Sequence, residues 1–396
     1  MYLPEYKLPL HVFAYGFRPH FLLAGLAALI LVPLWALSFV AGTQLGSGWP
    51  PTLWHGHEML FGFIGSAIAG FLLTAVPSWT GQKGYAGAPL VALALLWLIA
   101  RLMILSSPSW PPVLTAAADL TFLPLLAVLI AVPLARQRSR NTPLLLVLGL
   151  LWLTNLVFHV AVLRGNPPLA RHALLLGIDI SLVLVTIIGG RIVPAFTASA
   201  LRQQGIPCAV QSQPALTVMA VASMVLIAAG DLFWPETRIA GVLAGIAATI
   251  QFLRLLQWRS LRTLRQPIVW ILHVAYAWLP LGLGLKAAAL LGRYAFGAFW
   301  LHALTIGALA TMITAVMTRA SLGHTGRALI VHPLTIVAYV LLTAAALVRV
   351  FGLAVLRLNY PQVIVVAASF WTLSFAFFVW VYAPILLGPR ADGKPG

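Results

Sequence analysis

Histidine is the residue type in this sequence whose placement points most clearly to chemistry. The segment Trp54–Met59 reads Trp-His-Gly-His-Glu-Met and sets two imidazoles beside a carboxylate. Neutral imidazole is the commonest metal ligand in proteins and suits iron, copper and zinc, and histidines on facing helices also bind haem iron. The segment therefore predicts a metal or haem site.

The spacing within this segment limits which side chains can share one ion. On an α-helix His55 and His57 are separated by about 200°, so they do not easily face the same ion unless the segment is a loop. His55, Glu58 and Met59 share one helix face, which leaves His57 to point towards a second centre. Glu58 is the strongest candidate for proton or metal chemistry, because a carboxylate beside two histidines is costly to keep in apolar surroundings.

A short pattern recurs at three places along the chain. His57, His172 and His302 are each followed five residues later by a glycine, near the start of an apolar run. The pairs Thr80-Gly81 and Thr325-Gly326 stand at the same offset from His57 and His302. A recurrence every four helices suggests three four-helix units. It would place three histidines at similar depth on three separate helices.

The histidines divide evenly between the two predicted sides of a membrane. The outer group, which we predict to supply the metal ligands, is His55, His57, His159, His172 and His302. These five residues come from four helices and could converge on one interior pocket. The alternative for each is a solvated histidine or one hydrogen-bonded to a neighbouring helix. For His159, which lies one turn after Asn155, ligation and such a hydrogen bond remain equally open.

Acidic residues are scarce within the apolar runs, and ionisable groups inside a bilayer are functional candidates by default. Asp119 is expected to pair with Arg101 in a structural role. Asp179 lies two turns below His172, where it could orient a ligand or carry protons.

Arginine occurs with glycine or proline at helix ends on the side opposite the outer histidines. The motifs are Phe17–Pro19 around Arg18, Gly189–Thr197 around Arg191, and Arg319–Arg327, which contains Arg319 and His324. Such ends can bind a phosphate or a haem propionate, so these four residues are candidate cofactor contacts. The alternative is a basic loop with turn glycines.

Composition shows which solvent surrounds these residues. Of the 396 residues 61% are hydrophobic and 8% are charged, whereas a soluble domain carries about 25% charged residues. A soluble fold of this size cannot hide so much apolar surface, so lipid must surround most of the chain. The net charge of +17 comes from short clusters between apolar runs, which excludes a nucleic-acid-binding surface. The single cysteine, Cys208, excludes an internal disulfide and cysteine-based zinc or iron–sulfur sites.

Twelve apolar runs are long enough to span a bilayer, which takes about 17 to 25 residues each. The sequence predicts an all-α integral membrane protein of about twelve transmembrane helices in one polytopic domain, residues 1–396, with a polar loop at 199–213 between its halves. Lys and Arg number sixteen on one side and eight on the other, so both termini are expected in the cytoplasm. The runs are 20–41, 55–79, 88–106, 112–135, 143–164, 170–192, 214–231, 237–256, 267–290, 299–318, 330–351 and 363–388.

Several of these motifs together resemble the NnrS family of bacterial membrane proteins. The matching pieces, in order along nearly the whole chain, are Phe17–Pro19, Trp54–Phe63, Thr74–Pro77 with Trp79–Gly81, Gly189–Thr197, His273–Pro280 and Arg319–Arg327. His20 and Ser78 stand where the family pattern has Phe and Asn. The resemblance implies a haem- and copper-containing protein of the nitric oxide response, in the bacterial cytoplasmic membrane.

These observations combine into one hypothesis. A haem lies between the second and tenth helices, bound by His57 or His55 and by His302, and copper uses some of His55, His159 and His172. The haem binds nitric oxide or passes electrons from a donor that the sequence does not name, while Glu58 or Asp179 handles protons. The sequence specifies no reaction.

Two rival functions remain open at this point. A metal-free transporter would need discontinuous helices and a polar site near the membrane midplane, where this sequence has few polar residues. A membrane electron-transfer subunit of cytochrome b type would hold two stacked haems, which the even division of the histidines permits.

Overall fold

The chain folds into a bundle of long helices, seen in a computed structural model that describes residues 11–43, 48–206, 210–292, 294, 297 and 299–394. No strand occurs among these described residues. Cys208 and the terminal residues 1–10 lie outside them. The helices are α1 (Phe17–Ala41), α2 (Pro51–His57), η2 (Glu58–Ile64), α3 (Gly65–Thr80), α4 (Ala88–Leu105), α5 (Pro112–Arg136), α6 (Leu144–Leu163), α7 (Pro167–Gln203), α8 (Pro214–Phe233), α9 (Arg238–Leu256), α10 (Pro267–Gly292), α11 (Trp300–His302), η6 (Ala303–Ala310), α12 (Thr311–His324), α13 (Pro333–Phe351) and α14 (Tyr360–Leu387), with short 3₁₀ turns at His11–Phe13, Ser107–Ser109 and Ser260–Thr263.

Twelve helical spans in the described residues are long and apolar enough to cross a membrane, which confirms the predicted fold class. Two of these spans are composite: α2, η2 and α3 form the second, and α11, η6 and α12 form the tenth. Many of these helices begin at a proline. The N–H groups of the first helical turn have no partner within the helix, so proline loses no hydrogen bond there, and its ring fixes φ near the helical value. Prolines at the first helical position are Pro51, Pro112, Pro167, Pro214, Pro267 and Pro333.

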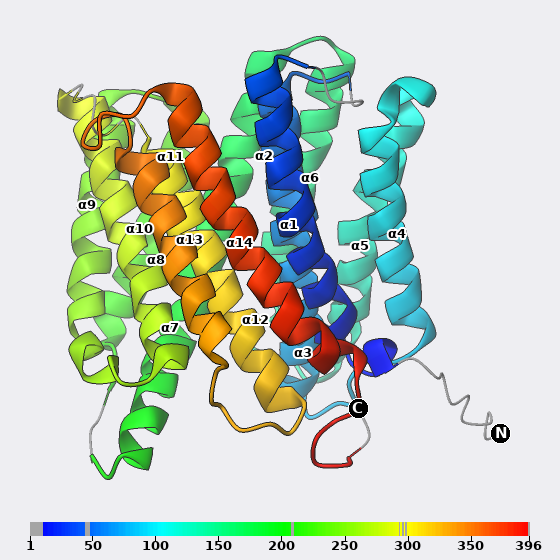
Figure 1. Cartoon of the computed structure of the whole chain (residues 1–396), viewed down its shortest axis with the longest axis vertical. Helices are drawn as coiled ribbons and strands as arrows, with labels where there is room; N and C mark the ends of the chain where they lie inside the picture. Colours follow the sequence, from blue (N-terminus) through cyan, green and yellow to red (C-terminus); the bar gives the residue numbers. More distant parts are fainter. Residues whose placement is uncertain are drawn as a thin grey trace.

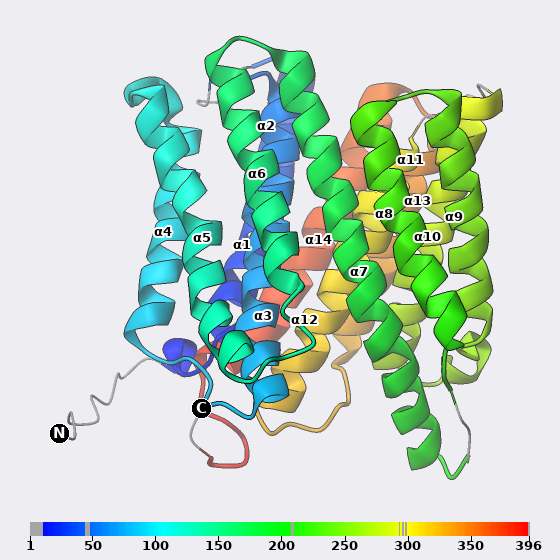
Figure 2. The ribbon, with the colours of Figure 1, turned by 180° about the vertical axis from the view of Figure 1, so that it is seen from behind.

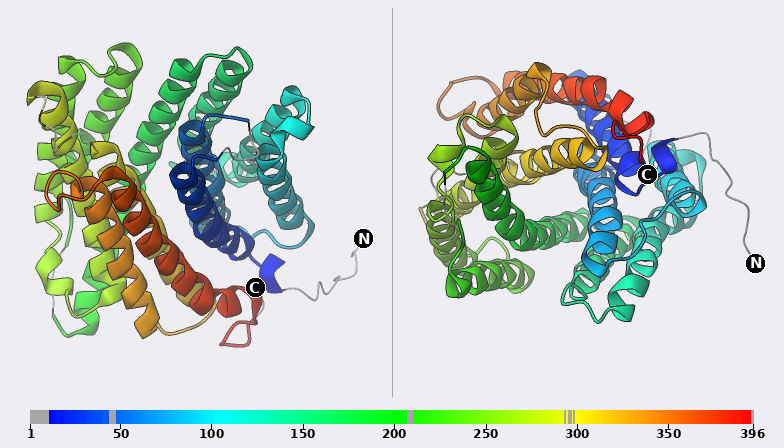
Figure 3. Two further views of the ribbon diagram at one scale, coloured as in Figure 1. Left: turned by 45° about the horizontal axis from the view of Figure 1, so that its top comes forward. Right: turned by 90° about the horizontal axis from the view of Figure 1, so that it is seen from below.

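The first long helix, α1, packs against the last, α14 (Figure 1). Trp371 of α14 donates a hydrogen bond to the Ala28 carbonyl of α1 at 2.8 Å. Arg18, at the start of α1, donates to the carbonyls of Leu386 at 3.1 Å and Gly388 at 2.7 Å, at the end of α14. The start of α1 and the end of α14 therefore lie at the same end of the bundle. Both views of Figure 3 show α14 beside α1.

Seen from behind, α7 runs between a group formed by α4, α5 and α6 and a group formed by α8 and α9 (Figure 2). At 37 residues α7 is the longest helix, and it continues through Ser199–Gln203, which the sequence assigns to the polar loop. These residues stay helical because Ala200 and Leu201 are buried and the Ala200 carbonyl accepts a hydrogen bond from Gln266 at 3.4 Å. The polar connection between the halves is therefore shorter than predicted.

The repeat seen in the sequence has a structural counterpart in two of its three copies. A π-helical segment starts directly after His57 and another directly after His302, as η2 and η6. Thr80-Gly81 and Thr325-Gly326 end the two spans, and both glycines adopt a left-handed φ, 64° and 72°. The third copy, at His172, is ordinary α-helix inside α7. π-Helical turns are rare and are often found at functional sites.

Glycine at position 307, within η6, allows α10 to approach closely. A Cβ atom at Gly307 would lie 2.4 Å from the Trp278 ring. We expect Gly307→Ala to lower the free energy of unfolding by about 1–3 kcal/mol through overpacking. Gly149→Ala is the control, because a Cβ there has no neighbour within 4 Å and alanine favours helix. Thermal unfolding in detergent measures both variants, and equal melting temperatures would contradict the packing.

Candidate metal and haem sites

Two groups of histidines, the first buried and the second partly buried, lie at the end of the bundle opposite the chain termini. The first joins η2 and α2 to α4, α5 and α6, and we call it the charged cluster. All of its side chains are at most 8% exposed. Its members are His57, Glu58, Arg101, Asp119, Asn155 and His159.

Arg101 is the centre of the charged cluster. Its guanidinium donates to Glu58 at 3.1 Å and forms a second ion pair with Asp119. The predicted pair of Arg101 and Asp119 is therefore present. His159 lies with Nε2 3.0 Å from Asp119 Oδ2, so this histidine makes an interhelical hydrogen bond.

The ring of His57 faces oxygen atoms on both sides. Nδ1 lies 3.1 Å from Glu58 Oε1, and Nε2 lies 3.1 Å from Asn155 Oδ1 and 3.2 Å from Asp119 Oδ2. The Asn155 amide donates to Asp119 at 2.7 Å, which turns its oxygen towards His57. A neutral imidazole has one donor and one acceptor, so only the doubly protonated ring can donate on both sides.

Charge balance leaves room for one cation in this cluster. With both imidazoles neutral, Glu58 and Asp119 outweigh Arg101 by one negative charge. Either a proton on His57 or a monovalent metal ion would neutralise it. His57, Asp119 and His159 each offer one ligand atom, and these three atoms lie within 4.8 Å of one another. Imidazole ligands suit copper, so this donor set fits a copper ion.

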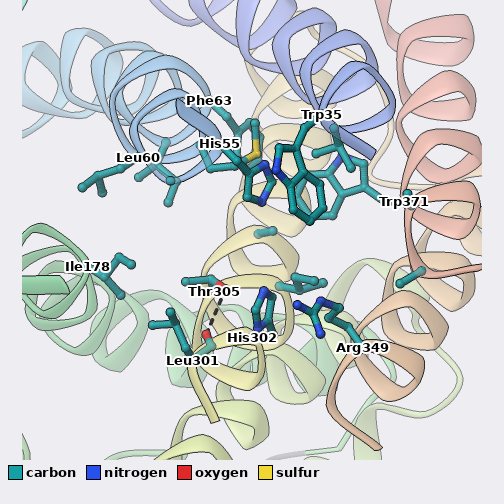
Figure 4. A pocket seen from close by; sticks show the side chains of 18 of the residues that line it. Trp35, His55, Leu60, Phe63, Ile178, Leu301, His302, Thr305, Arg349 and Trp371 are labelled. Carbon is teal, nitrogen blue, oxygen red and sulfur yellow. Dashed lines mark hydrogen bonds between the residues drawn. The ribbon is translucent and has the colours of Figure 1, made fainter. Parts of the chain in front are cut away.

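The second group surrounds an apolar cavity, which we call the histidine pocket. His55 and His302 point into it from opposite sides, and Arg349 of α13 lies beside His302 (Figure 4). Trp35 of α1 stacks on His55 with a centroid distance of 4.2 Å. The remaining wall is mainly apolar and includes Met59, Leu60, Phe63, Ile178, Leu301, Ile364 and Trp371.

Several polar atoms of this pocket lack the partners that buried groups normally have. The Nδ1 atoms of His55 and His302 are buried without a hydrogen bond, as are Trp35 Nε1 and one terminal nitrogen of Arg349. An unpaired buried donor or acceptor costs about 1–3 kcal/mol, so each needs an explanation. Two imidazoles with unpaired Nδ1 atoms, on separate helices, fit the donor set for a haem iron.

The volume of the histidine pocket limits which molecules it can hold. Its volume is about 130 Å³, below the roughly 300–1,000 Å³ of pockets for drug-sized ligands. A diatomic gas fits this space directly. A porphyrin fits only if the lining side chains and helices move apart.

A model of the NnrS protein family matches residues 11–390 of the chain. The chain belongs to the NnrS family. Membership ties it to the nitric oxide response, and the family is generally associated with metal or haem binding. No curated protein matches the chain.

The structure divides the predicted ligands of this NnrS-family chain between different places. His57 and His302, the first pair considered for haem, do not share a pocket, whereas His55 and His302 do. Glu58 does not share the face of His55 and Met59, because it turns with His57 into the charged cluster where the π-helical segment begins. His172 and Asp179 line a third cavity, between α7 and α10.

The four candidate cofactor residues at the other end do not reach the histidine pocket. Arg18 binds the end of α14, Arg191 donates to Asn141 at 2.7 Å, and Arg319 lies 3.8 Å above the Phe196 ring. His324 stacks on Tyr15 at 6.0 Å. All of these contacts serve the packing of helix ends and loops.

The chain beyond α14 folds back onto this same end. Arg390 donates to the His324 carbonyl at 2.9 Å and to both Asp392 oxygens. Those hydrogen bonds from the guanidinium hold the pKa of the Asp392 carboxyl well below its usual range.

Sequence reasoning missed Arg349 and Trp35 as pocket residues. Arg349 stands inside an apolar run, and this position could have identified it, because a charge within a membrane span ordinarily faces the protein interior. Trp35 carried no comparable signal, because tryptophan is common throughout this chain.

Removing one carboxylate tests how far the charged cluster supports the fold. We expect Asp119→Asn to lower the free energy of unfolding by about 1–3 kcal/mol, because Arg101 and His159 each lose a buried hydrogen-bond partner while Glu58 still pairs with Arg101. Glu236→Gln is the matched control: it breaks an ion pair with Arg171 that is 60% and 59% exposed, and such exposed pairs contribute only about 0–1 kcal/mol. Thermal unfolding in detergent gives the comparison. Similar losses for the two variants would show that the cluster adds little stability.

Proposed function

We propose that this protein holds a haem in the histidine pocket, between His55 and His302, and that it binds nitric oxide or transfers electrons there. The observation that carries the proposal is the pair of imidazoles, each with a buried and unpaired Nδ1 atom, that face one apolar cavity from two separate spans. Family membership supplies the connection to nitric oxide.

The residues of the pocket have separable tasks. His55 and His302 would hold the haem iron once the lining moves apart to admit the porphyrin, and stacking on Trp35 fixes the plane of the His55 ring. Arg349 brings a positive charge that suits a haem propionate. The apolar wall excludes water, so that a neutral gas is preferred to polar molecules. When bound, the haem supplies an iron centre that can take a diatomic ligand or an electron.

Copper, the second cofactor, is assigned to the charged cluster. His57, Asp119 and His159 would hold the ion, and the single excess negative charge favours a monovalent cation. This assignment replaces the looser set of His55, His159 and His172, because the structure places those three in three different surroundings.

The same proposal covers location and partners. The excess of Lys and Arg at the end that carries both chain termini supports a cytoplasmic position for this end in a bacterium, with both histidine groups near the outer face of the inner membrane. A partner protein would deliver electrons to the pocket from that outer side, and lipid surrounds the twelve spans.

Two variants should separate the cofactors. We expect His302→Ala to lose the Soret band and retain copper, because it removes a haem ligand only. We expect His159→Ala to lose copper and retain the Soret band. Optical spectra and metal analysis on the purified variants provide both readouts.

His324→Ala is the control for these variants, because His324 lies at the opposite end and should change neither readout. Loss of both cofactors in one variant would show that the sites are not independent. A Soret band that survives His302→Ala would reject the pocket as the haem site. A wild-type protein with neither haem nor copper would favour the metal-free transporter.

A further inference from the structure

A second cavity adjoins the histidine pocket and has the opposite character. We call it the polar cavity. Its volume is about 660 Å³, and it lies among α7, α8, α9, α10 and α11. Charged and titratable side chains line it, from the exposed pair of Arg171 and Glu236 to the buried Lys286. The other members of that kind are His172, Asp179, Asp231 and Arg238.

Three buried ionisable groups form the inner part of the polar cavity. Asp179, Asp231 and Lys286 are 3%, 8% and 2% exposed. Lys286 forms an ion pair with Asp231, and its ammonium lies 4.6 Å from the centre of the Trp300 ring. Asp179 lines the same cavity as this pair, and its Oδ2 atom is buried without a hydrogen-bond partner.

The charges of these three groups do not balance if both carboxyls are ionised. Two carboxylates beside one ammonium leave one negative charge uncompensated, and an unpaired buried carboxylate is costly in low dielectric. Lys286 is paired with Asp231, so the proton belongs on Asp179. A protonated Asp179 carries no charge, and its O–H group can donate to a neighbouring acceptor.

The wall between the two cavities is thin. Ile178 and Leu301 line both the histidine pocket and the polar cavity, and Figure 4 shows both at one side of the histidine pocket. Asp179 directly follows Ile178 in α7, and Trp300 lies two residues before His302. We therefore expect a change of charge in the histidine pocket to change the electrostatic potential at Asp179.

We propose that the polar cavity is a proton-exchange site for the histidine pocket, with Asp179 as the group that holds and releases the proton. The inference rests on the proposed function, because the charge to be compensated would arise at the haem. Asp231, Lys286 and His172 face Asp179 within the cavity, and the other charged groups stand at its mouth.

The proton is balanced in this scheme. With the histidine pocket empty or the haem reduced, the carboxyl of Asp179 keeps its proton. An oxidised haem would carry one more positive charge, which favours the carboxylate, so that the O–H bond of Asp179 breaks and the proton passes to water in the cavity. When an electron returns, a proton from that water restores the carboxyl.

Infrared spectroscopy of the purified protein tests the proton without any need for haem. We expect the wild type at neutral pH to show the C=O band of a protonated carboxyl that shifts in D₂O, because the cavity admits water. Asp179→Asn should lack this band. Asp231→Asn should also lack it, because Asp179 must then ionise to pair with Lys286.

Glu236→Gln is the matched control, since Glu236 is an exposed acid at the mouth, and it should retain the band. Absence of the band in the wild type, a band that does not respond to D₂O, or a band that survives Asp179→Asn would each overturn the proposal.

The haem-loaded protein is used to test whether the two cavities are coupled. Its midpoint potential should fall with rising pH in the wild type and should fall less steeply in Asp179→Asn. A normal carboxyl band in a protein without a Soret band would leave the proton site standing and reject the haem. A Soret band with an unaltered pH dependence in Asp179→Asn would reject the coupling alone.

Discussion

The low dielectric of the bilayer is the constraint on which this structure depends. Backbone groups within the spans must pair inside the protein, which explains the helical fold, and side-chain charges must do the same. Arg101 meets this requirement by joining η2, through Glu58, to α5, through Asp119. Lys286 meets it in the other half of the chain by pairing with Asp231. Each half thus contains a buried cation that is paired with a carboxylate.

Against this background the histidine pocket is an exception. The described residues that line it supply no carboxylate for Arg349 and no partner for the Nδ1 atoms of His55 and His302. Four unpaired polar atoms thus gather around one apolar cavity, whereas the carboxylates and imidazoles of the adjacent cluster all have partners. Unpaired groups are tolerated where an occupant supplies the missing interactions, which is the physical basis for placing a cofactor there.

Most of the fold could be predicted from the sequence, because hydropathy reports directly on burial in lipid. The twelve runs and their proline boundaries need only local information, and α7 was longer than predicted because tertiary contacts keep Ala200 and Leu201 helical. The pairing of Asp119 with Arg101 was also predictable, since few other partners exist. The separation of His55 from Glu58 could not be predicted, because it depends on a π-helical segment for which the sequence has no recognisable pattern. Arg349 was missed because its neighbour, His302, lies on a distant part of the chain.

An optical spectrum of the purified wild-type protein, reduced and then exposed to nitric oxide, tests the central claim most directly. The account predicts a Soret band that shifts when the gas is added, because the apolar pocket admits a neutral diatomic molecule, which can replace one of the two histidines at the iron. An unmoved Soret band would show a closed electron-transfer haem and contradict gas binding. The absence of any Soret band after expression with ample haem would contradict the assignment of the pocket as a haem site.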